Sequence, residues 1–149
     1  MSGTSLDGVD LVYCVFKTGN ADSVNKLNDF KKEERQDSTT GDRNWSYEVL
    51  KATTIPYPEA LKQKLAQAMS LSGYELALLH NELGRYIGTQ VNEFMADFAE
   101  EVELIASHGH TVFHRPDLGM TLQIGSGADI AAICGKPTVC DFRTLDVAL

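Results

Sequence analysis

Residues 72–98 read SGYELALLHNELGRYIGTQVNEFMADF. Apolar residues recur in it at spacings of three and four, which predicts one long amphipathic helix with a single buried stripe. The stripe consists of Leu76, Leu79, Leu83, Ile87, Val91, Phe94 and Phe98. Ser72 and Glu75 have the spacing of a capping box at the start of this helix. Gly84 and Gly88 each cost a helix about 1 kcal/mol relative to Ala, so we expect its backbone to approach a neighbouring strand or helix closely there.

Two strands are expected before this helix. Residues 9–16, VDLVYCVF, are apolar on both faces, which is typical of a strand in the middle of a sheet. A second strand is predicted over about residues 46–55, where Tyr47, Val49 and Ile55 are found. The polar residues 18–44 between the two strands are interpreted as a long hairpin connection.

Short elements alternate quickly after the helix. Strands are predicted at 104–107, 121–124 and 138–140, and a helix is predicted at 129–134 with Gly135 as its cap. Two paired strands followed by helix-linked strands indicate the α/β class, with a mixed sheet flanked by helices. The length of 149 residues is that of one domain.

Composition excludes several classes of function. Hydrophobic residues make up 43% of the chain and charged residues 23%, which excludes a mostly disordered protein. The net charge of −8 disfavours a phosphate backbone, so we expect no nucleic-acid partner. There is no apolar run of about 20 residues and no secretory signal, so we expect a cytoplasmic protein without a membrane span. Cys14, Cys134 and Cys140 lie in apolar segments without CxxC spacing, which indicates free thiols in a reducing compartment.

Two segments contain residues suited to chemistry at the ends of strands. In SGTSLDG, residues 2–8, glycines and hydroxyls could surround a phosphate while Asp7 holds Mg²⁺; the alternative is a plain hairpin turn. In SHGHTVFHRP, residues 107–116, three histidines could bind zinc, donate hydrogen bonds to a sugar, or serve packing.

Two further segments follow the same logic. LQIGSGADI, residues 122–130, predicts a strand, a GxG turn and a helix, where free N–H groups could bind an anion or the turn could simply be tight. VCDFRTLD, residues 139–146, places Asp141 at the carboxyl end of a strand, where α/β sheets present catalytic groups. A structural pair of Asp141 with Arg143 is the alternative.

Taken together, MSGTSLDGVD, SHGHTVFHRP, TLQIGSGADIA and DFRTLDVA resemble, in this order and spacing, the 1,6-anhydro-N-acetylmuramic acid kinases. These are bacterial sugar kinases of the actin-like ATPase superfamily. The resemblance extends over residues 1–149, with residues 18–44 the least matched. It implies a ribonuclease-H-like domain and a cytoplasmic role in the recycling of cell-wall fragments.

The resemblance also implies roles for individual residues. ATP phosphates and Mg²⁺ would be held at a loop formed by Gly3, Thr4, Ser5, Leu6, Asp7, Gly8, Val9 and Asp10, with Mg²⁺ at Asp7 directly or through water. Asp141 would be the catalytic base, because an ionised carboxylate can take the proton of a water that attacks the anomeric carbon. The amino sugar would be bound by His108, Gly109, His110, Thr111, Gln123, Ile124, Gly125 and Arg143. The product would be N-acetylmuramic acid 6-phosphate, formed with opening of the anhydro ring.

The chain departs from the family pattern at His110, where the family usually has Gln. We also expect residues 1–149 to be the N-terminal, substrate- and phosphate-side domain of a two-domain kinase that lacks its second domain here and is inactive alone. The first alternative is a truncated, non-catalytic module that binds muramyl sugars or a partner protein. A weaker alternative is a zinc hydrolase that uses His108 and His110. A homodimer is compatible with the sequence.

Overall fold

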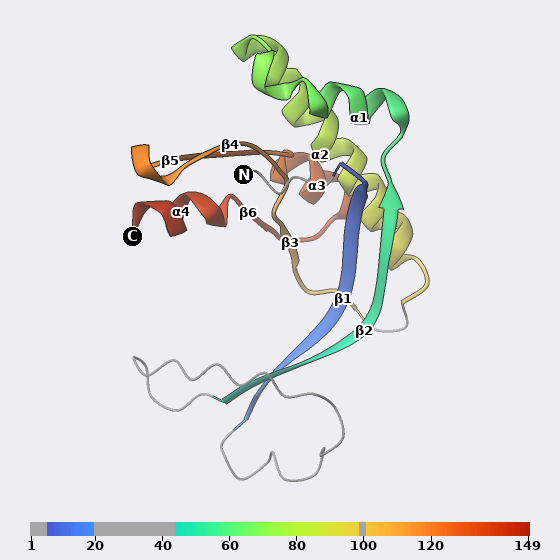
Figure 1. Ribbon diagram of the computed structural model, residues 1–149. Coiled ribbons are helices and arrows are strands. Elements are labelled where there is room, and N and C mark those ends of the chain that lie inside the picture. The colour runs from blue at the N-terminus through green and yellow to red at the C-terminus, as the bar shows by residue number, and fades with distance from the viewer. Residues whose placement is uncertain (1–5, 20–43, 99–100) are drawn as a thin grey trace. The chain divides into compact units, whose positions relative to one another are not determined.

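The computed structural model describes residues 6–19, 44–98 and 101–149 (Figure 1). The chain divides into two units, one formed by Met1–Leu11 with Thr54–Leu149 and the other by Val12–Thr53. In chain order the elements are β1 (Gly8–Gly19), β2 (Asn44–Pro56), α1 (Glu59–Ala66), η2 (Ala68–Ser70), α2 (Gly73–Met95), β3 (Ile105–Ser107), β4 (His110–Arg115), η3 (Pro116–Leu118), β5 (Met120–Ile124), α3 (Gly127–Cys134), β6 (Thr138–Cys140) and α4 (Phe142–Ala148). No helix in these described ranges is long and apolar enough to cross a lipid bilayer.

The strands pair two by two. β1 pairs with β2, β3 lies parallel to β6, and β4 lies antiparallel to β5 with an irregularity between Thr111 and Phe113. The α/β class is therefore confirmed, but the described strands form three separate ladders where one mixed sheet was expected. β3 and β6 are only three residues long, so their pair has a short edge. In the β4–β5 pair, the irregularity in β4 bends that strand and interrupts the ladder. Neither pair therefore offers a long straight edge to a further strand.

Most predicted elements are present with small shifts at their ends. α2 begins as expected, since Ser72 and Glu75 form both hydrogen bonds of the capping box, but it ends at Met95 and so does not include Phe98. α3 is capped by Gly135, whose φ of 63° is left-handed as predicted. The hairpin connection expected at 18–44 falls almost entirely outside the described residues.

β4 and α4 are among the elements that were not predicted from the sequence. β4 lies within the histidine-rich segment that was expected only to follow a strand, and α4 directly follows Asp141. β4 was missed because it contains histidines where a strand typically has apolar side chains. α4 was missed because its seven residues are too few to show a helical period.

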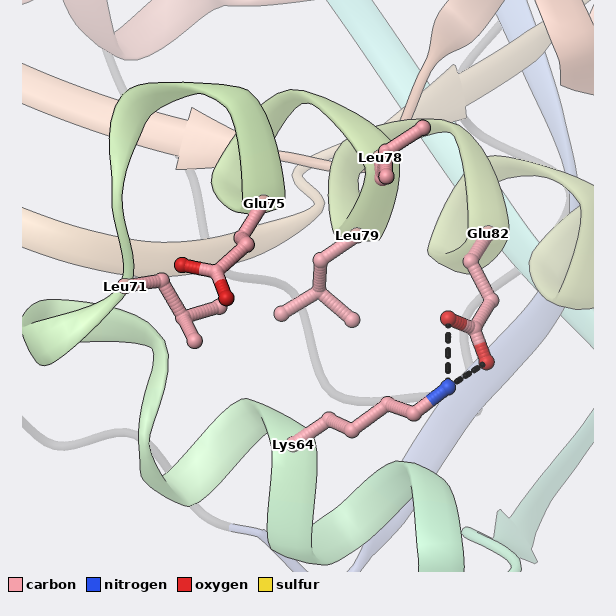
Figure 2. A pocket seen from close by; sticks show the side chains of 6 residues that line it. All are labelled: Lys64, Leu71, Glu75, Leu78, Leu79 and Glu82. Atoms are coloured by element: carbon pink, nitrogen blue, oxygen red, sulfur yellow. Dashed lines mark hydrogen bonds and ion pairs between the residues drawn. The ribbon is translucent and has the colours of Figure 1, made fainter.

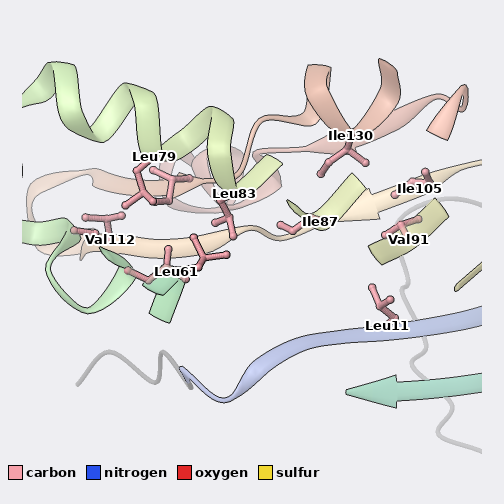
Figure 3. Close-up of a cluster of buried hydrophobic side chains, with 12 residues drawn as sticks. Leu11, Leu61, Leu79, Leu83, Ile87, Val91, Ile105, Val112 and Ile130 are labelled. Atoms are coloured by element: carbon pink, nitrogen blue, oxygen red, sulfur yellow. The ribbon is translucent and has the colours of Figure 1, made fainter. Parts of the chain in front are cut away.

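The core of the larger unit is built on the buried side of α2 (Figure 3). Leu83 of α2 and Ile130 of α3 are both fully buried, with an exposed fraction of 0%. Around them are gathered the remaining buried apolar side chains, namely Leu11, Leu61, Leu65, Ala68, Leu79, Ile87, Val91, Ile105, Val112 and Ile124. The apolar stripe of α2 thus brings together the strands and helices that follow it in the chain.

The two glycines of α2 mark its closest contacts. A Cβ atom at Gly84 would lie 2.6 Å from the backbone nitrogen of Ser126, and one at Gly88 would lie 3.2 Å from the Cα of Ile130. The close approach predicted from Gly84 and Gly88 is therefore confirmed, and the neighbour is the segment that leads into α3 and α3 itself.

We predict that Gly84→Ala lowers the free energy of unfolding by about 1–3 kcal/mol, because the new methyl group overlaps backbone atoms of Ser126 that no side-chain rotation can clear. Gly73→Ala in the same helix is the matched control, since nothing lies within 4 Å of a Cβ there. It should be neutral or stabilise the protein by up to about 1 kcal/mol. Urea denaturation measures both, and equal effects of the two substitutions would contradict the close contact.

Candidate functional site

The carboxyl ends of β3 and β6 bring two predicted site residues together. The parallel register places Ser107 beside Cys140, so the residues that follow them, His108 and Asp141, leave the same end of this pair. The His108 ring also contacts the ring of Phe142, with centroids 5.9 Å apart. Functional groups in α/β proteins gather at this end of parallel strands.

Asp141 has an unusual backbone conformation. Its φ of 58° and ψ of 26° are left-handed, and in the described ranges it is the only residue other than glycine with a positive φ. The hydroxyl of Thr144 donates to the Asp141 carboxylate at 2.5 Å, which orients an otherwise exposed side chain. Strained residues of this kind persist where the surrounding structure imposes them, and they cluster at functional sites. No ion pair with Arg143 occurs among the described residues, so such a pair is not what holds Asp141.

The turn at Gly109 touches the turn at Gly125. Both glycines have a positive φ, 68° and 119°, and a Cβ on Gly125 would lie 3.4 Å from the Cα of Gly109. A Cβ on Gly109 would overlap the carbonyl oxygen of Ile124. The histidine segment and the GxG segment, separate in sequence, therefore meet at their glycines.

The same GxG segment also touches the end of β6. A Cβ on Gly127 would lie 2.5 Å from the sulfur of Cys140, the residue before Asp141. Three of the four predicted segments thus converge, and they contribute His108, Gly109, Gly125 and Asp141 to one place in the fold.

His80 of α2 is a residue of this place that sequence reasoning missed. The backbone N–H of Gly125 donates to its Nδ1 at 3.2 Å, and the N–H of Ser126 donates to its carbonyl oxygen at 3.0 Å. In the first turn of α3, the N–H of Asp129 donates to the hydroxyl of Ser126, which caps the helix. The anion-binding interpretation of the GxG turn is therefore wrong for these groups, which are already paired. The missed signal was the spacing of His80 and Gly84, which places them on one helix face.

Polar side chains share one face of β4 and β5. The side-chain amide of Gln123 donates to the Thr121 hydroxyl at 2.6 Å, and Nδ1 of His114 lies 3.3 Å from the same hydroxyl. Thr111 lies opposite Gln123 in the ladder. The side-chain amide oxygen of Gln123, Oε1, is buried and has no hydrogen-bond partner among the described residues. It is therefore an acceptor that a donor group of a ligand could satisfy. Thr121 and His114 were not predicted as site residues.

The three histidines of the segment do not converge on one point. His110 is buried, with 8% of its surface exposed, and it pairs with the buried Ile124. His108 faces Phe142 and His114 faces Thr121. In the part of the chain that the structure describes, no group of three or more His, Cys, Asp or Glu residues could hold a metal ion. The geometry gives the zinc-hydrolase alternative no support.

The N-terminal segment is described only from Leu6 onward, so Gly3, Thr4 and Ser5 lie outside the described residues. Gly8, Val9 and Asp10 belong to β1 itself. The Thr54 hydroxyl donates to the Asp10 carboxylate at 2.6 Å, and a Cβ on Gly8 would overlap the carbonyl oxygen of Ile55. Gly8 therefore permits the close pairing of β1 with β2. Leu6 and Val9 pack against the core, and Asp7 is exposed.

A separate pocket of about 250 Å³ lies between α1 and α2 (Figure 2). In this pocket the ammonium group of Lys64 donates hydrogen bonds to both carboxylate oxygens of Glu82, at 2.7 and 2.8 Å. Its other lining residues are Leu71, Glu75, Leu78 and Leu79. It contains none of the residues predicted to bind sugar or phosphate.

Comparison with known proteins gives a consistent result. The sequence model of the anhydro-N-acetylmuramic acid kinase family matches residues 39–149. Proteins named anhydro-N-acetylmuramic acid kinase from Gloeothece citriformis, Acaryochloris marina and Bacillus cereus are 33%, 34% and 32% identical to the chain. Each alignment covers 99% of this chain and 36%, 35% and 36% of the respective relative. The chain thus spans about a third of the length of the curated relatives it matches.

We predict that His110 makes stability depend on pH. Burial, and then the neighbouring His108, lower the pKa of the His110 ring below its ordinary value of about 6.5. The unfolded chain regains the ordinary pKa and so binds more protons as the pH falls. The stabilisation is therefore complete above about pH 6.5 and is lost as the pH falls toward the lower pKa of the folded state, by at most about 1.4 kcal/mol per pH unit.

Urea denaturation at a series of pH values, on the unsubstituted chain and on His110→Gln, measures this effect. Gln is similar in polarity but does not titrate, so the substitution should flatten the curve below about pH 6.5. Identical pH profiles for the two proteins would show that the burial of His110 does not couple to folding.

Proposed function

The chain belongs to the anhydro-N-acetylmuramic acid kinase family, and from this we propose that it provides the sugar side of an ATP-dependent kinase for 1,6-anhydro-N-acetylmuramic acid. In the proposed reaction, water adds to the anomeric carbon and the bond from that carbon to O6 breaks. O6 then takes the γ-phosphoryl group of ATP, which gives N-acetylmuramic acid 6-phosphate and ADP. The released proton comes from the attacking water.

The observation that supports this proposal best is the placement of Asp141. Its carboxylate is exposed, oriented by Thr144, and attached to a strained backbone at the carboxyl end of β6. An ionised carboxylate in this position can take the proton of the attacking water, the task of a general base. His108 follows the neighbouring strand and can donate or accept a hydrogen bond at the same end.

The turns at Gly109 and Gly125 hold two of the proposed sugar-binding segments together. Both lack side chains where they meet, so the segments that contain His108 and Gln123 lie directly against each other. The side-chain Oε1 of Gln123, which has no partner among the described residues, can accept a hydrogen bond from an amide N–H or a hydroxyl group. An N-acetylated sugar has both kinds of donor. We assign Gln123 and Thr111 to sugar binding on this basis. His110 would act from within the fold, because its ring is buried.

The nucleotide side of the proposal involves the N-terminal segment. The exposed carboxylate of Asp7 is the kind of oxygen ligand that Mg²⁺ takes, and Mg²⁺ often uses only one or two carboxylates together with phosphate oxygens and waters. When bound, the ion would neutralise charge on the transferred phosphoryl group. We further propose a ribonuclease-H-like fold and a cytoplasmic location for the enzyme, in line with the family resemblance and the free cysteines described in the structure.

We predict that Asp141→Asn lowers kcat by about 10²–10⁴-fold with little change in KM, because Asn keeps the shape but cannot accept the proton. Asn also tolerates the left-handed conformation of this position, so folding should be preserved. The assay uses a chimera in which this chain replaces the matching third of the Bacillus cereus kinase. That kinase itself is the positive control.

Asp146→Asn is the matched control variant, because Asp146 is an exposed carboxylate of the same short helix. It should leave kcat unchanged. A near-normal kcat for Asp141→Asn in an active chimera would remove the base assignment. A chimera that folds, by circular dichroism and melting temperature, yet turns over no anhydro sugar would count against the proposed function itself.

A further inference from the structure

We propose that His80 is a positioning residue for the sugar site: its neutral ring and its main-chain carbonyl together fix the turn Gly125–Gly127 against α2. The sugar part of this inference rests on the proposed function. The part that concerns the turn does not, since it follows from hydrogen bonds within the chain. His80 itself would not touch the substrate.

Two hydrogen bonds carry the inference. Gly125 and Ser126, consecutive in the turn, donate their N–H groups to the ring Nδ1 and to the carbonyl oxygen of His80, at 3.2 and 3.0 Å. A carbonyl oxygen has two lone pairs, so that of His80 can accept from Ser126 in addition to its partner within the helix. One residue thus binds two adjacent backbone groups, which fixes both the position and the orientation of the turn.

The ring can act in this way only in one form. Because Gly125 donates to Nδ1, that nitrogen carries no proton, and the proton of the neutral ring lies on Nε2. Gly125 is buried, so loss of this acceptor would leave its N–H without a partner in a site with little access to water. The turn would then be expected to move toward solvent.

Such a movement would reach the carboxyl ends of β3 and β6. Gly125 packs against Gly109, and Gly127 packs against Cys140, which directly precedes Asp141. The turn can approach α2 only because residue 84 is glycine, since any side chain on Gly84 would overlap Ser126. His80 is therefore linked, through the turn, to Gly109 and to Cys140, which lie on two segments of the candidate sugar site. These close contacts leave little room for adjustment.

Three variants of this chain separate the hydrogen bond from other effects. His80→Asn places an amide oxygen where Nδ1 lies and so keeps an acceptor for Gly125. His80→Leu keeps a side chain of similar bulk but removes the acceptor of the Gly125 N–H. Asn81→Leu, at the next and exposed position of α2, controls for a general effect of Leu on the helix.

Amide hydrogen exchange measured by NMR is the first readout. The Gly125 N–H should exchange about tenfold faster in His80→Leu, the effect of losing one net hydrogen bond, and should remain protected in His80→Asn and Asn81→Leu. The ring-nitrogen spectrum of the unsubstituted chain should show the proton of His80 on Nε2. Unchanged Gly125 exchange in His80→Leu, or a proton on Nδ1, would overturn the proposal.

Affinity for 1,6-anhydro-N-acetylmuramic acid, from NMR titration of the same proteins, is the second readout. His80→Leu should weaken binding about tenfold, and His80→Asn should restore it, which a purely structural effect on α2 would not do. Equal affinities for all variants would overturn the role in sugar binding. If the unsubstituted chain binds no sugar, the proposed function fails, while hydrogen exchange still decides whether His80 holds the turn.

Discussion

Close backbone contact between α2 and residues 125–134 organises the larger unit. Leu83 and Ile130 are fully buried across this contact, and Gly84 and Gly88 allow the two backbones to approach. The hydrophobic effect supplies the driving force, since it grows with the apolar area removed from water. The glycines decide how close the segments come, because a single methyl group at Gly84 would displace the turn.

The geometry of the candidate site follows from that contact. The turn at residues 125–127 is held against α2, and Gly109 and Cys140 pack against the same turn. The parallel pairing of β3 with β6 then places His108 next to Asp141. A left-handed aspartate is unfavourable by itself, and it is retained because neighbouring contacts fix the chain on both sides of it. Stability supplied by α2 thus supports a strained residue at the site where chemistry is proposed.

Local signals in the sequence predicted the local features of this fold. The capping box at Ser72, the apolar stripe of α2 up to Phe94 and the left-handed Gly135 each depend on a few neighbouring residues, and each was predicted correctly. Phe98 was wrongly included in the stripe, because the helix ends at Met95. Strand pairing and the role of His80 depend on contacts between residues far apart in the chain, and periodicity contains no information about these. The four motifs identified the family, yet they did not show that Gly8 lies within β1 or that the N–H groups of Gly125 and Ser126 are already paired with His80.

In the proposed function, segments far apart in sequence form one sugar-binding site at the carboxyl ends of β3 and β6. NMR titration of the isotope-labelled chain with 1,6-anhydro-N-acetylmuramic acid, and with N-acetylmuramic acid as the matched sugar that lacks only the anhydro bridge, tests this placement. We predict that the backbone amides of His108, Gly109, Gly125 and Asp141 shift together along one saturating curve, and that the control sugar binds more weakly. Shifts confined to the pocket around Lys64 and Glu82, or no saturable shift at all, would contradict it.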